Sequence, residues 1–132
     1  MIIYIIIIIT FRSNISKIDD IFITLDTHHK EHIAFSHFWI NNSGEHPLPY
    51  MIISNNDIIE KKWYPVDMNR YEYCQSYTKQ LEAKGRFQLV IWPNHCIQGS
   101  NGHEIANRLQ IALNKWNKNH ENKRIRYIKK GT

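Results

Sequence analysis

Three short apolar runs alternate with two longer segments of helical periodicity, and this alternation restricts the fold more than any other feature. Residues 20–26 (DIFITLD), 87–92 (FQLVIW) and 124–129 (RIRYIK) are rich in β-branched and aromatic residues and predict strands. Residues 67–84 and 102–118 carry apolar side chains at helical spacing. We therefore expect an α/β chain built from βαβ units around a parallel sheet.

Each helical segment carries its own boundary signals. The apolar stripe of the first segment consists of Tyr71, Cys74, Tyr77 or Thr78, and Leu81. The stripe of the second segment consists of Ile105, Leu109, Ala112, Leu113 and Trp116. Gly85 follows the first segment as a C-terminal stop, and Ser100 or Asn101 is available as the N-cap of the second. Two amphipathic helices that bury these stripes are expected.

Chemically active side chains stand at the ends of the three predicted strands. Asp26 ends the first strand, His95 follows the second at a proline turn, and Lys130 follows the third. In parallel α/β sheets, ligands bind beyond the carboxyl ends of the strands. We therefore expect Asp26, the turn at His95, and Lys130 to converge on one rim of the sheet.

The stretch at residues 25–32, LDTHHKEH, combines a carboxylate with three imidazoles. Asp26 and His28 are two residues apart and share one side of a strand exit, while His32 is close enough to reach back. His95 could supply a third corner from another strand. Neutral imidazole and carboxylate suit zinc, iron or manganese. The alternative is a polar turn that leaves a strand, because eight histidines make chance clusters common, and spacing alone leaves both interpretations open.

The other histidines, the tryptophans and the cysteines have structural explanations. His29 is expected to point away from His28. Surface positions are expected for His37, His46, His103 and His120, and packing roles for Trp39, Trp63 and Trp116. Cys74 lies on a helical apolar stripe and is expected to be a buried, inert thiol. Cys96 is next to His95, but adjacent side chains in an extended segment diverge, so a nucleophile–base pair is not expected.

The charge and the cysteine content restrict the class of protein. The chain has 132 residues, enough for one domain, and a net charge of +5. Much of the basic excess lies near the C-terminal end, at Lys115, Lys118, Lys123, Arg124, Arg126, Lys129 and Lys130. No nucleic-acid-binding signature accompanies these residues, and we predict no nucleic-acid partner. Two cysteines without a C-x-x-C pair predict a reducing, cytoplasmic setting and no disulfide framework.

The first sixteen residues are dominated by an isoleucine run, MIIYIIIII. Its length of about ten apolar residues is half of what spanning a bilayer requires, so no membrane span is predicted. The segment also lacks the basic region and cleavage site of a signal peptide, and a buried strand is favoured over an anchor. Residues 12–18 are too short for a parallel crossover. The isoleucine run is therefore something else, or the start of the domain is missing or altered.

Five motifs in order resemble one known family. They are D-T-H-H-x-x-H-I-A-F, H-P-x-P, W-x-P, I-W-P-x-H-C-x-x-G-S-x-G-H and Y-x-K-K-G. Together they resemble the isochorismatase-like cysteine hydrolase superfamily, and within it the nicotinamidase-like amidohydrolases. The resemblance covers residues 17–132 and leaves residues 1–16 outside the expected hydrolase domain.

The resemblance implies a three-layer α/β/α fold with a parallel sheet of Rossmann-like topology. It also implies conversion of an amide such as nicotinamide to an acid and ammonia, with a divalent metal, usually zinc, beside the catalytic residues. By motif, Asp26, His28 and His95 match the metal ligands, and His32 matches a less constant ligand. Lys130 matches the catalytic lysine, with its neighbour Lys129 as the alternative after a one-residue slip.

Two parts of the family's catalytic machinery have no match. The family's aspartate follows the first strand in a D-x-Q motif, where this chain has Phe11, Arg12 and Ser13. The family's nucleophile lies in a segment like A-T-D-x-C-V beyond the lysine, and Cys96 does not match it. We therefore expect a hydrolase domain truncated at both ends, inactive alone, that acts on a small-molecule amide only with a complementing chain or as a homo-oligomer. The alternative is a non-catalytic remnant that binds metal or a partner.

Overall fold

The structure is a computed structural model that describes residues 18–83, 85, 87–120 and 123–131. The isoleucine run, and with it the predicted domain boundary between residues 16 and 17, lies outside the described residues. The chain is mixed α/β and divides into two compact units. The described residues up to Thr27 and from Gly99 onward form the first unit, and His28–Gln98 form the second. Each unit is described by itself.

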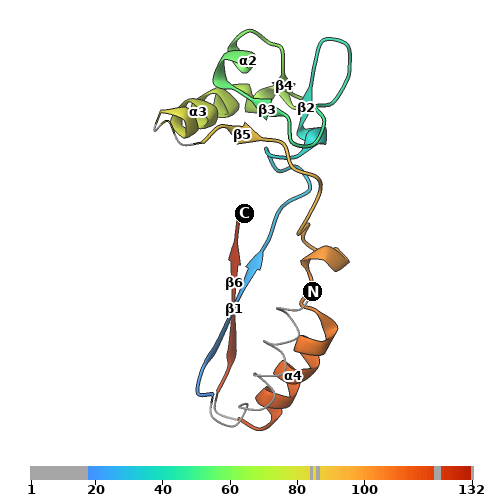
Figure 1. Cartoon of the computed structure of the whole chain (residues 1–132), viewed down its shortest axis with the longest axis vertical. Coiled ribbons are helices and arrows are strands. Elements are labelled where there is room, and N and C mark those ends of the chain that lie inside the picture. Colours follow the sequence, from blue (N-terminus) through green and yellow to red (C-terminus); the bar gives the residue numbers. More distant parts are fainter. Residues whose placement is uncertain (1–17, 84, 86, 121–122, 132) are drawn as a thin grey trace. The chain divides into compact units, whose positions relative to one another are not determined.

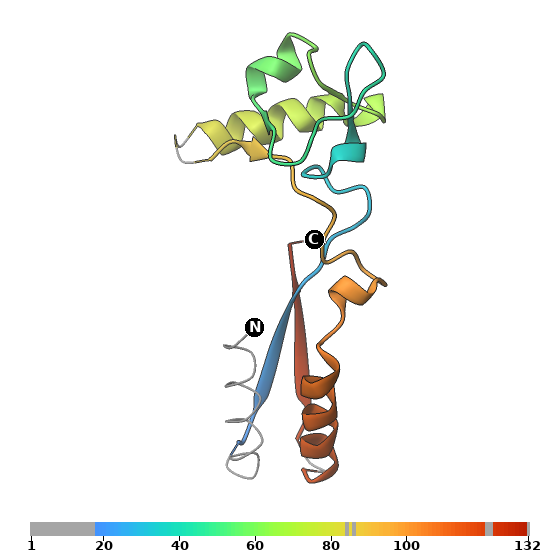
Figure 2. The ribbon, with the colours of Figure 1, turned by 45° about the vertical axis from the view of Figure 1, so that its right-hand side comes forward.

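The first unit contains a pair of parallel strands and one α-helix. Strand β1 (Ile21–Asp26) pairs in parallel with β6 (Ile125–Lys130), and helix α4 (Asn107–Lys118) runs alongside them (Figures 1 and 2). A short 3-10 helix, η4 (Asn101–His103), precedes α4. The two outer strands expected from the sequence and their parallel arrangement are therefore confirmed.

Helix α4 buries the C-terminal part of the predicted apolar stripe, whereas Leu109 is partly buried and Ile105 precedes the helix. Ala112, Leu113 and Trp116 are almost fully buried. The indole N–H of Trp116 donates to the Ile18 carbonyl at 3.2 Å, and the ring of His120 stacks on the indole with centroids 4.6 Å apart. The helix therefore packs against the rest of its unit mainly through Trp116, with Ala112 and Leu113 beside it.

The predicted start of α4 is wrong. Ser100 is the N-cap of η4, and α4 begins only at Asn107 after Ala106, which makes no side-chain capping bond. The reason is the extended backbone at Glu104 (φ −80°, ψ 152°), which ends the first helical turn and separates it from the long helix.

Apart from helix α3, the second unit consists of short elements (Figure 1). Two antiparallel pairs are formed by β2 (Trp39–Ile40) with β4 (Tyr64–Pro65) and by β3 (Ile52–Ile53) with β5 (Leu89–Val90). The helices are η2 (Ser36–Phe38), α2 (Asn55–Ile59), η3 (Met68–Arg70) and α3 (Tyr71–Glu82). Its core cluster consists of Ile33, Phe38, Trp39, Ile53, Ile58, Cys74, Leu89 and Ile91.

Helix α3 confirms the predicted helix at residues 67–84, but it begins later, at Tyr71, and ends earlier, at Glu82. Cys74 and Thr78 are fully buried on its inner side, and Gly85 takes a φ of +63° just beyond it. Such a backbone favours glycine and terminates the helix. The first predicted turn is η3 instead, where the Asp67 side chain accepts from the Asn69 backbone N–H at 3.1 Å.

The expected central strand at residues 87–92 is mostly absent. Only Leu89–Val90 form a strand, and it pairs antiparallel with Ile52–Ile53, so the parallel sheet of the described residues has two strands. Both backbone groups of Ile91 bond to a neighbouring loop. Its N–H donates to the Met51 carbonyl, and its carbonyl accepts from the Tyr50 N–H. The short strand therefore belongs to an antiparallel pair of the second unit and not to the parallel pair of the first.

Candidate metal-binding site

Three of the four predicted metal ligands form a cluster in the second unit. The ring of His28 lies 4.9 Å, centroid to centroid, from the ring of His32 and 4.9 Å from that of His95. His28 and His32 come from the stretch that follows β1, whereas His95 follows β5 after a long excursion of the chain. The structure therefore brings together imidazoles that are far apart in the sequence.

Backbone bonds at both ends of the cluster hold its two segments side by side. The N–H of His28 donates to the Cys96 carbonyl at 2.9 Å, and the N–H of Gln98 donates to the His28 carbonyl at 3.0 Å. Further along, the N–H of Trp92 donates to the Ala34 carbonyl at 2.7 Å. Cys96 has a φ of +48°, in the left-handed region, which bends the chain just after His95.

His95 and His32 differ in the ring nitrogen that is available to a ligand. Nδ1 of His95 lies 2.7 Å from the Pro93 carbonyl, which can only accept, so Nδ1 carries a proton and Nε2 keeps its lone pair when the ring is neutral. Nδ1 of His32 accepts from the Ala34 N–H at 3.2 Å, so neutral His32 carries its proton on Nε2. His95 is thus in the tautomer that binds a metal through Nε2, and His32 must give up its backbone bond or change tautomer.

The surroundings of His32 favour its neutral form. Burial lowers the pKa of His32 below its ordinary value, and the nearby His28, His95 and His29 lower it further when they are charged. Metal ions bind the neutral imidazole, because the protonated ring has no free lone pair. The cluster therefore supplies one of its ligands in the required charge state.

The donor set fits zinc in composition and spacing. Two imidazoles on one tetrahedral zinc, with Zn–N of about 2.1 Å, place their ring centres about 5 Å apart, close to the spacing of His28 from its two neighbours. Among the residues that the structure describes, however, no group of three or more histidine, cysteine or acidic side chains is arranged to hold a metal ion. Coordination would require the rings to rotate.

The other predicted residues of the site, Asp26 and Lys130, meet in the first unit. They are direct register partners at the carboxyl ends of β1 and β6, and Lys130 Nζ donates to Asp26 Oδ1 in an ion pair. Neighbouring strand residues point to opposite faces, so Lys130, rather than Lys129, shares the face of Asp26. The predicted meeting of Asp26 and Lys130 is confirmed. His95 belongs to the other unit, and its place on that rim stays a prediction.

Most side chains that were assigned structural roles have them. Trp39 and Trp116 are fully buried and Trp63 packs against the core. Burial raises the pKa of the Cys74 thiol to about 12, which makes it inert. His103 is not a plain surface residue, because its Nε2 bonds the hydroxyl of fully buried Thr27 at 2.8 Å.

Sequence reasoning missed Phe35. Its fully buried ring lies 5.6 to 5.8 Å from all three clustered imidazoles. The only sequence signal was an apolar residue three positions after His32, which is too common to indicate a role in a site.

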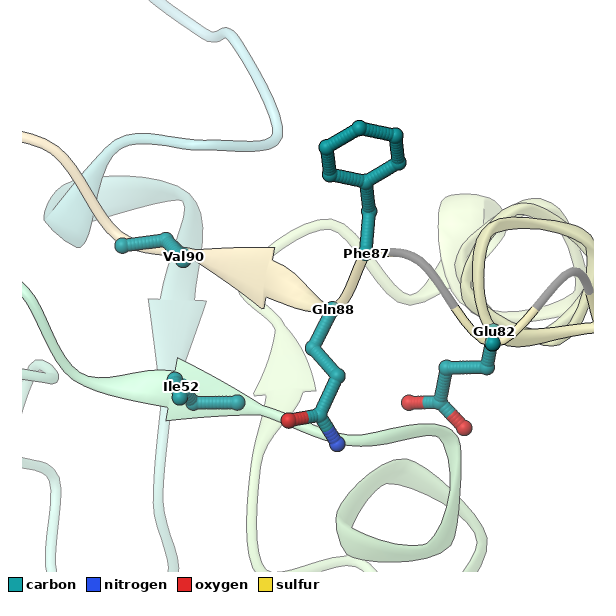
Figure 3. A pocket seen from close by; sticks show the side chains of 6 residues that line it. Ile52, Glu82, Phe87, Gln88 and Val90 are labelled. Atoms are coloured by element: carbon teal, nitrogen blue, oxygen red, sulfur yellow. The ribbon is translucent and has the colours of Figure 1, made fainter.

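A concavity of about 500 Å³ lies elsewhere in the second unit (Figure 3). It is lined by Ile52, Glu82, Gly85, Phe87, Gln88 and Val90. The side chains of Gln88 and Glu82 extend to the same side, whereas the Phe87 ring points away from them (Figure 3). Glu82 Oε1 already accepts from the Asn55 N–H at 2.8 Å. We place the candidate site at the histidine cluster, because this concavity contains none of the predicted site residues.

No family model, curated protein or solved structure matches the chain. Its function is therefore inferred from its residues and their geometry. Among the described residues, no helix is both long enough and apolar enough to cross a membrane.

Proposed function

We propose that the chain is a metal-binding part of a nicotinamidase-like amidohydrolase domain and that His28, His32 and His95 hold a divalent metal, zinc. The observation that carries this proposal is the contact of three imidazole rings from two distant segments. The histidines fit in type and spacing, because imidazole is a common zinc ligand and the ring of His28 lies 4.9 Å from those of His32 and His95. When bound, the ion would supply Lewis-acid chemistry toward a donor atom of the substrate.

Asp26 and Lys130, which form an ion pair in the first unit, are the other proposed functional residues. Asp26 is the fourth candidate ligand, and its carboxylate is exposed enough to exchange its partner, with 51% of the side chain accessible. Lys130 is the proposed catalytic lysine, because an ammonium beside a thiol lowers the thiol pKa and favours the nucleophilic thiolate. The fold proposed for the complete domain is a three-layer α/β/α arrangement.

The nucleophile is the missing element in these 132 residues. Amide hydrolysis of this type needs a thiolate that attacks the carbonyl carbon. Cys74 is fully buried with a pKa of about 12, and Cys96 directly follows the proposed ligand His95 and does not match the family's nucleophile. We therefore propose that the chain alone binds metal and does not cleave amides, and that a complementing chain or a further copy completes the site in the cytoplasm.

A second candidate function is a non-catalytic module that binds metal or a partner chain. Exposed apolar side chains on β1 and β6 favour it: Phe22, Tyr127 and Ile128 each expose about half of their surface. Parallel sheets normally have both faces covered. A partner that covers these side chains would stabilise the two-stranded pair without adding chemistry.

Zinc uptake by the purified chain tests the proposed function. We expect one zinc per chain by calorimetry and metal analysis, lost in a variant with His28, His32 and His95 all changed to alanine. His29→Ala is the matched control, because this exposed neighbour makes no ring contact with the cluster. Retention of zinc by the triple variant would exclude the site. Zinc-dependent release of ammonia from nicotinamide by the chain alone would exclude the proposed lack of catalysis.

A further inference from the structure

The surroundings of Phe35 are unusual for a buried phenylalanine. Its side chain is fully inaccessible, yet it is not one of the residues of the hydrophobic core cluster. Its ring contacts are with histidines: His28 at 5.8 Å, His95 at 5.6 Å and His32 at 5.6 Å, with His37 at 6.0 Å. The ring neighbours of this buried phenylalanine are therefore imidazoles.

The contacts have the geometry that aromatic rings prefer. The Phe35 ring stands at 86° to that of His28 and at 80° to that of His95, which are edge-to-face arrangements. Such pairs stabilise a fixed orientation beyond the effect of burial alone. The ring of His32 meets Phe35 at 58°. One phenyl ring thus restricts three imidazoles at the same time.

The backbone of Phe35 is held by both segments that carry the histidines. Its N–H donates to the His32 carbonyl at 3.0 Å, and it forms a parallel bridge with Trp92, three residues before His95. The position of the phenyl ring is therefore set by the same hydrogen bonds that bring the two segments together. A shift of either segment would move the ring and the histidines together.

We propose that Phe35 is the positioning residue of the histidine cluster: its buried ring holds the imidazoles of His28, His32 and His95 together so that one metal ion can bind them. This inference rests on the proposed metal-binding function. Phe35 supplies no ligand atom. Its ring contacts keep the three imidazoles close together before the metal arrives, and the imidazoles then turn to direct their nitrogens at the ion. Supporting groups of this kind change metal affinity by about ten- to a hundredfold.

Phe35→Leu tests this role, because it keeps an apolar side chain and removes the aromatic ring. Phe38→Leu is the matched control: Phe38 is a core residue nearby whose ring contacts Trp39 and Arg70. Three quantities are measured for each protein: zinc affinity by chelator competition, the imidazole proton resonances of the metal-free chain, and the urea midpoint. Phe35→Met is a second variant of similar volume in case Phe35→Leu does not fold.

We expect Phe35→Leu to bind zinc about tenfold or more weakly and to shift the resonances of all three histidines. Phe38→Leu should lower the urea midpoint and leave the zinc affinity and these resonances unchanged. Wild-type affinity and unchanged resonances in folded Phe35→Leu or Phe35→Met would overturn the inference and leave the proposed function intact. If the wild-type chain takes up no zinc, the proposed function fails, and the resonances of the metal-free variants still decide whether Phe35 orients the cluster.

Discussion

Asp26 and Lys130 are register partners at the ends of β1 and β6, and their side chains form an ion pair. Parallel pairing explains the contact, because it places the carboxyl ends of both strands at one edge. Both side chains are about half exposed, so the pair is screened by water and salt. The pair therefore adds little to the stability of the fold, and its exposed position at the strand ends suits a functional site better.

The Asp26–Lys130 pair should contribute little to folding. We expect Lys130→Met to change the free energy of unfolding by at most about 1 kcal/mol, and by less at high salt. Lys129→Met is the control, since Lys129 lies on the opposite face of β6. Urea unfolding at two salt concentrations measures both variants. A much larger loss that is specific to Lys130 would mean that the pair is shielded from water.

His95 and His32 are proposed ligands whose ring nitrogens bond to the backbone, and their removal should affect zinc binding to different degrees. The bond of His95 Nδ1 to the Pro93 carbonyl selects the neutral tautomer whose Nε2 is free for a metal, whereas His32 must first lose its bond to Ala34. We expect His95→Ala to lower the zinc affinity by at least tenfold more than His32→Ala. Chelator competition measures the two constants under identical conditions. Equal losses would show that the hydrogen bonds of the metal-free rings do not matter.

Cys74 should be unreactive in the folded chain. Only a thiolate alkylates rapidly, and burial raises the pKa of this thiol to about 12 from 9.0. We expect iodoacetamide at pH 8 to label Cys96 alone in buffer and both cysteines in urea, as counted by mass spectrometry. The Cys96→Ser variant is the control and should stay unlabelled until it unfolds. Rapid labelling of Cys74 without urea would contradict its burial.

The same thiol makes stability depend on alkaline pH. Its pKa is raised on folding, so its contribution is complete below pH 9 and is lost as the pH rises from 9 toward 12, because the unfolded chain releases the proton first. We expect the urea midpoint to fall over this range and to fall less in Cys74→Ala. Burial also raises the pKa of Tyr77, so the comparison is most specific between pH 9 and 10. Parallel curves for both proteins in that interval would rule out the contribution of Cys74.

Thr27→Val should destabilise the first unit. The Thr27 hydroxyl donates to the Leu25 carbonyl at 3.1 Å and accepts from His103 at 2.8 Å, and the side chain is fully buried. Valine keeps the shape and removes both bonds, which we expect to cost about 1–2 kcal/mol in unfolding free energy. Thr24→Val, at an exposed position of β1, is the control in the same urea titration. Equal midpoints for the two variants would contradict a structural role for the Thr27 hydroxyl.

Local patterns predicted the elements that depend on their own side chains. The β-branched runs of β1 and β6 and the apolar stripes of α3 and α4 were visible in the sequence, since periodicity reflects which face of an element is buried. The segment at 87–92 has an equally apolar pattern, yet only Leu89–Val90 form a strand. The pairing of this segment depends on hydrogen bonds to the loop at Tyr50 and Met51, and no pattern within the segment predicts these bonds.

The sequence by itself determined the alternation of strands and helices, and it placed Asp26 and Lys130 at strand ends where parallel pairing would bring them together. It also supplied His28, His32 and His95 as candidate ligands. Only the tertiary structure decided that the rings of His32 and His95 both lie beside that of His28, and that the Phe35 ring packs against all three. The physical reason is that periodicity is a property of neighbours along the chain. The cluster depends on backbone bonds between two segments, one around His28 and one around Cys96, that lie at opposite ends of the second unit's sequence.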